Sequence, residues 1–473
     1  MKTASYVIIG GGVSGALTAY HLSRRSQRTQ ILLIEPRPEA GLGLAYSTPS
    51  LRHLLNVPAG KISALPEQPH HFLHWVQRHY DPAMTESDFA PRAIFGRYVQ
   101  SLLAKTPDVK HLQATAVDCR LDGGQGVVTL TDGRMVAGGA VVLATGNFDP
   151  ARLPGVADEV VRSRAYCHSA WNEETYRGLH EDAEVALIGT GLTAVDVILR
   201  LREMGHRGGI TAISRHGVFP SRHARCAPLA QCVIAGEPPV RARELLRTVH
   251  DAIRAGKPWR AVIDSLRTRT NEFWLALPLD EQRRFRRHLQ RRWEVVRHRM
   301  APPIAKAIDA ELRAGTVVIR QGSLERVTPE GDGARVRVRS RAGAIFEVTA
   351  ARVINCTGPD LNYRRAGSAL LNSLFAQGLI SAGPLGGGLW SDADGALGAA
   401  DGTVSEVLFT LGPARQGTLL ESIAVPELRV QAVALAELLA QREHRAVTRC
   451  QAGVRAVSGG RLLRMPEVAE RGA

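Results

Sequence analysis

A strand, a glycine turn and a helix at the N-terminus constrain the fold more than any other stretch of the sequence. The apolar residues 6–9 lead into Gly10-Gly11-Gly12-Val13-Ser14-Gly15, and a second apolar run at 31–34 ends at Glu35. The glycines of such a turn allow a tight bend, a close backbone approach to a pyrophosphate and close packing of helix on strand. Free N–H groups at the helix start favour a diphosphate, and an acid about twenty residues further on can bind ribose hydroxyls. The segment predicts a dinucleotide-binding site.

The same unit occurs again in the middle of the chain. A strand pattern at 184–188 precedes Gly189-Thr190-Gly191-Leu192-Thr193-Ala194, and the next strand ends at Ser214 and Arg215. The first unit has an acid at this place, which suits a free 2′-hydroxyl, whereas Arg215 is able to neutralise a 2′-phosphate. The second unit therefore predicts a further nucleotide site and favours NADPH, with NADH still open.

Each of the two units also contains a stretch of alternating apolar residues, which is typical of a small antiparallel meander. The first meander covers residues 113–144 with Asp-Gly turn signals, and the second covers 316–348 with a turn around 330–333. They lead to Ala-Thr145-Gly146 and to Cys-Thr-Gly at 356–358. One order of motifs thus occurs twice, and this duplication is more specific than either glycine motif alone.

These patterns predict an α/β fold with two dinucleotide-binding (Rossmann-like) domains, each with a parallel sheet and a small antiparallel meander, plus a helical insert. A chain of 473 residues is too long for one compact core. Helical, arginine-rich sequence at 238–313 interrupts the second unit. Glycine-rich segments at 386–390 and 411–422 follow, and we expect the latter to open a long helix through Ala440. We expect the C-terminal part to complete the first domain.

Composition limits the other classes of protein. The formal charge is +15 at pH 7, and the densest basic run, 283–299, places apolar residues at helical spacing on one face. That run fits a solvated helix face best, with contact to an anionic cofactor or substrate, or to nucleic acid, as alternatives.

Six scattered cysteines form no C-x-x-C pair and no metal-ligand spacing, so we expect neither a redox disulfide nor a metal site. No apolar run reaches the roughly 18 residues of a membrane helix. Residues 1–4 leave no room for a signal peptide, so we expect a cytoplasmic protein.

The motifs resemble those of the two-dinucleotide-binding flavoproteins. More narrowly, the chain is similar to the FAD-NAD(P)-binding family that contains the FAD-dependent urate hydroxylase, and more distantly to flavin monooxygenases such as the ornithine and lysine N-hydroxylases. The resemblance spans nearly the whole chain. The segments that carry it are residues 10–15, 43–46, 54–60, 91–92, 96–98, 189–196, 297–300 and 411–427.

This resemblance implies FAD on the first unit and NAD(P)H on the second. It implies a FAD-binding domain that begins with residues 1–165 and is completed by 359–473, and an NAD(P)H-binding domain at 166–358 with the insert. Val117 is expected beside adenine, Asn56 and Val57 beside the isoalloxazine, and Gly417-Thr418 at the N-terminus of the last helix, facing the pyrimidine side of the flavin. The full set expected to bind FAD is Gly10, Gly11, Gly12, Val13, Ser14, Gly15, Glu35, Pro36, Tyr46, Asn56, Val57, Val117, Thr145, Gly146, Gly412, Gly417 and Thr418. The set expected to bind NAD(P)H is Gly189, Gly191, Thr193, Ser214 and Arg215.

The function implied by the resemblance is that of a monooxygenase. NAD(P)H reduces FAD, oxygen adds to the reduced flavin, and the resulting hydroperoxide hydroxylates a small polar substrate. Urate and amines are concrete options, and the sequence leaves open carbon or nitrogen oxidation and the oligomeric state. Two alternatives are an NAD(P)H-dependent reductase or dehydrogenase that passes electrons to a quinone or protein partner, and a flavin-stabilised nucleic-acid-binding protein, which is disfavoured. The side chains able to grip an anionic substrate are Arg92, Arg97, Arg222, His223, Arg297 and His298.

Overall fold

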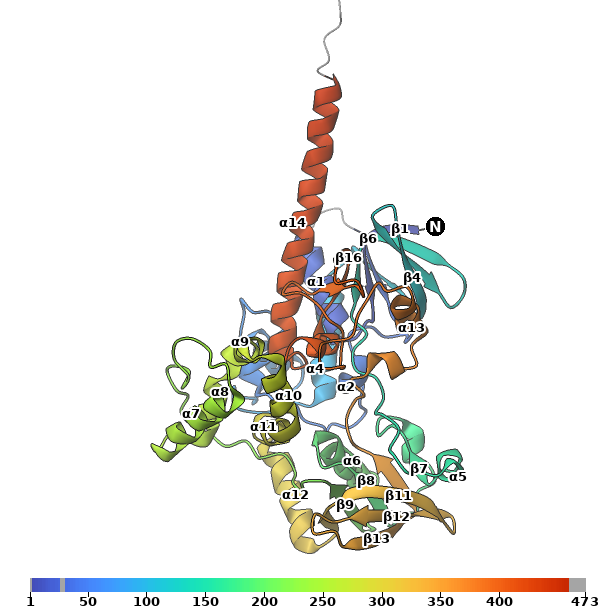
Figure 1. The fold of residues 1–473 in the computed structure, drawn as a ribbon, viewed down its shortest axis with the longest axis vertical. Helices are drawn as coiled ribbons and strands as arrows, with labels where there is room; N and C mark the ends of the chain where they lie inside the picture. Colours follow the sequence, from blue (N-terminus) through green and yellow to red (C-terminus); the bar gives the residue numbers. More distant parts are fainter. Residues whose placement is uncertain (1, 26–29, 459–473) are drawn as a thin grey trace, which may run out of the picture.

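The computed structural model describes residues 2–25 and 30–458, with side chains described for 5–25 and 30–445. Within these residues the predicted fold class is confirmed, because two parallel sheets, each accompanied by an antiparallel meander, form the body (Figure 1). A lobe of helices lies beside them, and one long helix runs away from the body.

The first sheet is built around the buried strand β1 (Lys2–Ile9). This strand pairs in parallel with β2 (Ile31–Ile34) on one side and with β6 (Met135–Leu143) on the other. Strand β3 (Val109–Leu112) lies beyond β2, and β16 (Val404–Thr410) lies beyond β6. The edge strand β15 (Ala396–Gly398) is antiparallel to β16. Since β15 and β16 follow the second unit in sequence, the chain returns to its first sheet near the C-terminus.

The meander predicted for 113–144 is present on this sheet. Strand β4 (Ala116–Asp122) pairs with β5 (Gln125–Leu130), which pairs with the first half of β6. The second half of β6 then pairs with β16. A single strand therefore belongs both to the meander and to the parallel sheet, and its carboxyl end returns to the glycine turn.

The second sheet repeats the strand order of the first. Its order is β10 (Val317–Gln321), β9 (Ile210–Ser214), β8 (Val185–Ile188), β14 (Arg352–Asn355) and β7 (Tyr166–Cys167), all parallel. The separate meander consists of β11 (Ser323–Glu330), β12 (Gly333–Arg339) and β13 (Ile345–Ala350). The predicted turn near 330–333 joins the first two of these strands.

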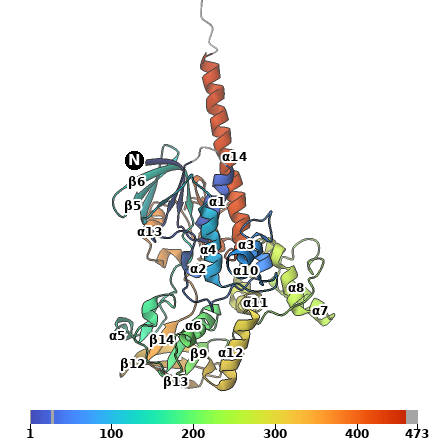
Figure 2. The same ribbon diagram turned by 180° about the vertical axis from the view of Figure 1, so that it is seen from behind.

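Helices position the sheets relative to one another. The apolar faces of α1 (Val13–Arg25), α4 (Arg92–Leu103) and α14 (Val425–Ser458) share one core on the first sheet. Helix α6 (Leu192–Glu203) packs on the second sheet. Figures 1 and 2 show that the C-terminal half of α14 extends past the body. The shorter elements are α2 (Gly43–Tyr46), α3 (His71–His79), α5 (Asp158–Arg162), α13 (Ala369–Ala376), η1 (Ala59–Lys61), η2 (Glu173–Thr175), η3 (Arg267–Arg269) and η4 (Tyr363–Arg365).

The helical insert forms the lobe at the side of Figure 1. It contains α7 (Ala242–Arg254), α8 (Trp259–Ser265), α9 (Thr270–Ala276), α10 (Leu279–His288) and α11 (Gln290–Arg297), and α12 (Pro302–Ala314) then returns to the second sheet. The basic run is therefore two helices rather than one. Phe285 and Leu289 pack into one apolar cluster, whereas Trp293 and Val296 pack into another, so the helix breaks at Leu289 to bury both pairs.

The C-terminal segment differs from its prediction. Gly412–Gly417 is the short 3₁₀ turn η5, and the long helix begins only at Val425. Pro426 explains this start, because proline is favoured in the first turn of a helix, where its missing N–H is not needed. Gly417 and Thr418 consequently do not lie at the N-terminus of the last helix. The final residues 459–473 of the predicted C-terminal part lie outside the described residues.

Candidate functional site

The two glycine turns have the same backbone geometry. Gly10 has φ 105° and Gly189 has φ 120°. A Cβ atom on either glycine would lie 2.3 Å from a carbonyl oxygen, that of Ala144 for Gly10 and that of Cys356 for Gly189. Each glycine also donates its N–H to a carbonyl at the end of the next strand at 2.8 Å, that of Ile34 for Gly10 and that of Ile213 for Gly189. The repeated sequence thus folds into the same tight turn twice, at the carboxyl edge where open α/β sheets bind ligands.

The carboxylate of Glu35 is fixed beside the first turn. It is buried at the end of β2, with only 3% of its surface exposed. One oxygen accepts the Gly11 N–H at 2.8 Å, and the other accepts the N–H and the Nε of Arg37 at 3.1 and 2.8 Å. A carboxylate held in this way keeps lone pairs available to accept from hydroxyl donors.

A cleft of about 220 Å³ lies between the two units. Its wall includes Gly12, Val13, Ser14, Tyr46 and Gly146 from the predicted FAD set and Thr193 from the predicted NAD(P)H set. Further residues of the segments that carry the resemblance also line it, namely Gly43, Leu44, Ala45, Pro413 and Ile423, together with Ala144 and Gly358 of the two predicted strand ends. The other wall residues are Leu42, Asn147, Phe148, Asp149, Pro150, Ala170, Trp171, Asn355, Pro359 and Leu428. One cleft therefore lies between the first glycine turn and the start of α6, which follows the second turn. Most of the other wall residues were not predicted as site residues, because the fold alone brings their segments together.

The lining of the cleft fits a flat, partly apolar nucleotide cofactor such as FAD. Leu44 and Ile423 line it with 40% and 36% of their surface exposed. At the neighbouring strand end, the buried Thr145 hydroxyl finds no hydrogen-bond partner among the described residues. A Cβ on Gly12 would lie 3.3 Å from the Gly43 Cα, so the two glycine loops meet without side chains between them. Thr145 lies between two wall residues, Ala144 and Gly146, and exposed apolar side chains at the opening are what a bound cofactor would cover.

The carboxyl end of β9 in the second unit is strongly cationic. Arg215 is exposed there, and its neighbour His216 has a pKa lowered by burial and by the positive charges of Arg215, Arg291, Arg292 and Arg341. Arg291 reaches across from α11 and donates to the carbonyl oxygens of Thr190 and Val218 at 3.1 and 2.9 Å. The insert thus brings arginines to the place where the strand pattern predicted one.

Several residues of the predicted FAD set lie outside the cleft wall. The carbonyl of Asn56 accepts a hydrogen bond from His223 Nε2 at 3.0 Å, and Val57 is buried in the core of the first domain. Gly417 packs backbone to backbone, since a Cβ there would lie 2.3 Å from the Leu389 oxygen. Thr418 accepts from Trp274 Nε1 at 3.0 Å through its carbonyl. Pro36 is exposed, Val117 is half-buried on β4, and Gly412 donates its N–H to Gln431.

The predicted substrate-gripping side chains do not converge on one pocket. Arg92 pairs with Asp196, Arg222 is exposed and lies 3.7 Å from Asp309, and Arg97 is exposed without an ion pair among the described residues. The buried Arg297 lies 3.6 Å from Glu421 and 3.5 Å from Glu427. Burial lowers the pKa of His298, and burial together with Arg299 lowers the pKa of His223 to about 4. At least three of these side chains therefore hold parts of the fold together.

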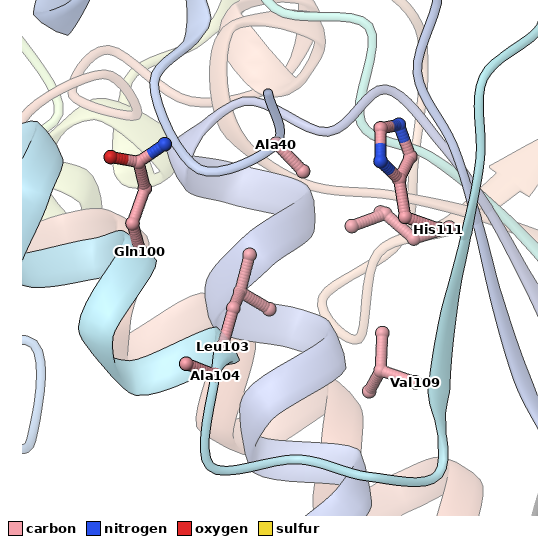
Figure 3. A pocket seen from close by; sticks show the side chains of 7 residues that line it. Ala40, Gln100, Leu103, Ala104, Val109 and His111 are labelled. Atoms are coloured by element: carbon pink, nitrogen blue, oxygen red, sulfur yellow. The ribbon is translucent and has the colours of Figure 1, made fainter. Parts of the chain in front are cut away.

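A second pocket, of about 250 Å³, lies away from both glycine turns. Figure 3 shows Gln100 and Leu103 of α4, with Ala104 directly after it, facing Val109 and His111 of β3. His111 Nε2 lies 3.2 Å from the Glu35 carbonyl oxygen. The pocket is thus next to β2, whose Leu33 lines it, on the side of the sheet that α4 covers.

The described residues form neither a metal-ligand cluster nor a membrane-spanning helix. They contain no group of three or more His, Cys, Asp or Glu side chains able to hold a metal ion. None of their helices combines the length and apolar character needed to span a bilayer.

The fold and the two glycine turns define the class of protein, an α/β protein with two dinucleotide-binding domains. Residues 7–148 match the model of the FAD-NAD(P)-binding family. The chain is 24% identical over 262 residues to the uncharacterized protein YdhS of Escherichia coli, and this match covers 46% of the chain and 47% of YdhS. The chain therefore aligns with about half the length of that curated relative.

Solved structures share the fold over nearly the whole chain. The ornithine hydroxylase PvdA of Pseudomonas aeruginosa is 16% identical with a TM-score of 0.63, covering 93% of this chain and 99% of PvdA. The ornithine N-hydroxylase KtzI of Kutzneria sp. 744, in a structure with reduced FAD and NADP⁺, is 15% identical with a TM-score of 0.60, covering 93% and 100%. Disulfide reductases also have this fold. At such identities the likeness establishes the architecture.

Proposed function

We propose that this protein is an FAD-dependent, NAD(P)H-using monooxygenase that hydroxylates a small polar substrate. The observation that carries the proposal is the single cleft whose wall contains Gly12 and Ser14 of the first unit and Thr193 of the second. Two nucleotides held at these turns would meet across one opening, which is what electron transfer from one cofactor to the other requires. The likeness to two ornithine hydroxylases supports a monooxygenase within this class.

The chain's own residues would position the cofactors. Gly12 and the N-terminus of α1 would bind the FAD pyrophosphate, and Glu35 would accept hydrogen bonds from the ribose. The Thr145 hydroxyl would donate to or accept from the cofactor beside it. FAD, when bound and reduced, would supply the oxygen-activating chemistry. The protein's task is then to align cofactor and substrate and to exclude water.

The cationic end of β9 supports NADPH as the reductant. Arg215, Arg291, Arg292 and Arg341 surround His216, so the local field is strongly positive. A 2′-phosphate carries negative charge that NADH lacks, and arginine binds phosphate oxygens through paired N–H donors. We expect these side chains to raise the affinity for NADPH selectively.

Disulfide reduction, the activity of some proteins with this fold, finds no support in the two buried cysteines. Cys119 and Cys356 are buried, and burial raises the pKa of the Cys119 thiol to about 12 and raises that of Cys356 as well. Thiolates are the reactive form, so neither is poised for exchange. Transfer of electrons to a quinone or protein remains the alternative to oxygenation.

The decisive experiment measures how tightly NADPH oxidation and oxygen uptake are coupled to product formation. The purified flavoprotein is given NADPH, oxygen and candidate substrates, urate and amino-acid amines among them, and NADPH, oxygen and hydroxylated product are counted. A monooxygenase yields one product per NADPH and per oxygen consumed. Consumption of NADPH with a quinone and without oxygen uptake would instead identify a reductase.

A further inference from the structure

A buried ion pair joins the two nucleotide-binding domains. Arg92, the first residue of α4, donates from Nη1 and Nη2 to the two carboxylate oxygens of Asp196 on α6, at 2.7 and 3.2 Å. Only 14% of the Arg92 side chain and 4% of the Asp196 side chain are exposed. This two-point geometry fixes direction as well as distance between the helices.

The same stretch of the first domain holds α6 at further points. His53 Nε2 lies 3.0 Å from the Asp196 carbonyl oxygen, and its Nδ1 lies 2.7 Å from the Thr48 hydroxyl. Arg92 also donates to the Leu54 carbonyl, and its N–H donates to the His53 carbonyl. Burial lowers the pKa of His53, which favours a neutral ring, and a neutral ring is able to make both contacts. The network leaves α6 little freedom to rotate away from the first domain.

A second attachment between the two domains lies a few residues after His53, at Leu54 and Asn56. His223, which follows β9 of the second domain, bonds to the Asn56 carbonyl and has its ring centre 5.0 Å from that of Phe89. Leu54 and Phe89 both pack against the apolar core of the second sheet. The segment around Asn56 and Val57, which was predicted to lie beside the isoalloxazine, is thus held against the second domain by a hydrogen bond and by apolar packing.

Helix α6 carries the glycine turn of the second unit at its N-terminus. Thr193, on the cleft wall, is three residues before Asp196 and therefore on the same face, one turn away. A small rotation of α6 about the ion pair would move Thr193 relative to Gly12 across the cleft. Reaction between two bound cofactors is sensitive to displacements of about 1 Å.

We propose that Arg92 and Asp196 are positioning residues that lock the second nucleotide unit against the first during electron transfer from NAD(P)H to FAD. This proposal rests on the proposed cofactors, and not on the identity of the substrate. In this step one hydride, which carries two electrons, passes from NAD(P)H to FAD. One NAD(P)H is thereby oxidised to NAD(P)⁺ and one FAD is reduced. The residues touch neither reacting atom and act through α6.

The test compares Asp196→Asn with a matched control at another ion pair of α6. Arg202 of α6 pairs with Glu311 of α12 at 3.0 Å, within the second domain, with side-chain exposures of 14% and 23%. Glu311→Gln therefore removes a comparable charge pair without touching the junction. Asp196→Glu, which keeps the charge but lengthens the side chain, serves as the conservative variant.

Two rates are measured in a stopped-flow instrument, namely anaerobic reduction of the flavin by saturating NADPH, and reoxidation by oxygen of protein reduced with dithionite. We expect Asp196→Asn to slow flavin reduction at least tenfold, with FAD content and the reoxidation rate unchanged. Asp196→Glu should reduce its flavin at a rate between those of Asp196→Asn and wild type, and Glu311→Gln should match wild type. Reduction of Asp196→Asn and Asp196→Glu at the wild-type rate would overturn the positioning role and leave the proposed function standing. Loss of FAD from both variants would also overturn it, by assigning the pair to cofactor retention. A wild-type protein that neither NADPH nor NADH reduces would overturn both proposals.

Discussion

Replacement of Gly10 by alanine tests the geometry of the first glycine turn. Gly10 has φ 105°, and an added Cβ would lie 2.3 Å from the backbone oxygen of Ala144. Gly133, in a turn of the same domain, has φ 81° and nothing within 4 Å of its Cβ position. Gly133→Ala should therefore cost only the left-handed backbone strain, roughly 1–2 kcal/mol. Gly10→Ala should cost this and a further 1–3 kcal/mol, roughly, because a backbone oxygen in a packed core has to move.

The assay is thermal unfolding of the FAD-free protein, followed by FAD titration. For a domain of this size the added 1–3 kcal/mol lowers the midpoint by roughly 2–12 °C beyond the effect of Gly133→Ala. Gly10→Ala should also lose FAD, whereas Gly189→Ala, with the same 2.3 Å contact in the second unit, should keep FAD and lose NADPH. Equal midpoints for Gly10→Ala and Gly133→Ala, with full FAD content in both, would refute the argument from close approach.

Three further predictions concern charge. Arg215→Glu should weaken the binding of NADPH at least tenfold, about 1.4 kcal/mol, and leave the binding of NADH little changed. The KM values for the two nucleotides measure this, and equal losses for both would argue against a phosphate contact. His223 has a folded pKa of about 4 against an ordinary 6.5, so the unfolded chain binds its proton more tightly. Its contribution to stability is therefore complete above about pH 6.5 and is lost as the pH falls toward 4, by up to about 3 kcal/mol. His223→Gln, which retains a donor for the Asn56 carbonyl, should show a smaller loss between pH 7 and 5 in urea unfolding, and an unchanged pH slope would contradict this. Glu421→Gln should destabilise the contact of the insert with the C-terminal segment by less than the roughly 3–5 kcal/mol of a fully broken buried pair, because Glu427 still lies 3.5 Å from the buried Arg297. Limited proteolysis of the insert would detect the loss, and wild-type resistance would count against it.

The sequence allowed the local architecture to be predicted because its signals are short-range. Glycine spacing, apolar runs and turn signals each specify ten to forty neighbouring residues, and the duplication predicted two domains, each with a parallel sheet and a meander. Gly12, Ser14 and Thr193 reached one cleft because both turns lie at carboxyl edges of parallel strands.

Other parts of the site depend on contacts between distant segments. Arg92 and Asp196 are 104 residues apart, and their pairing is set by how the domains dock. Arginine spacing alone could not distinguish an anion-binding side chain from one that pairs with a buried carboxylate, as Arg92 and Arg297 do. The break at Leu289 and the late start of α14 likewise follow from tertiary packing and from Pro426, which outweighed helical periodicity.

The central claim is that NADPH reduces a flavin held on the first unit and that the reduced flavin then serves oxygenation. The most direct measurement mixes the purified protein, with its FAD, anaerobically with NADPH and with NADH and follows the loss of visible flavin absorbance. Oxygen and candidate substrates are then added to count hydroxylated product. We expect rapid reduction, faster or at lower concentration with NADPH, and one product per NADPH with a true substrate. A protein that holds no FAD, or FAD that neither nucleotide reduces, would contradict the account.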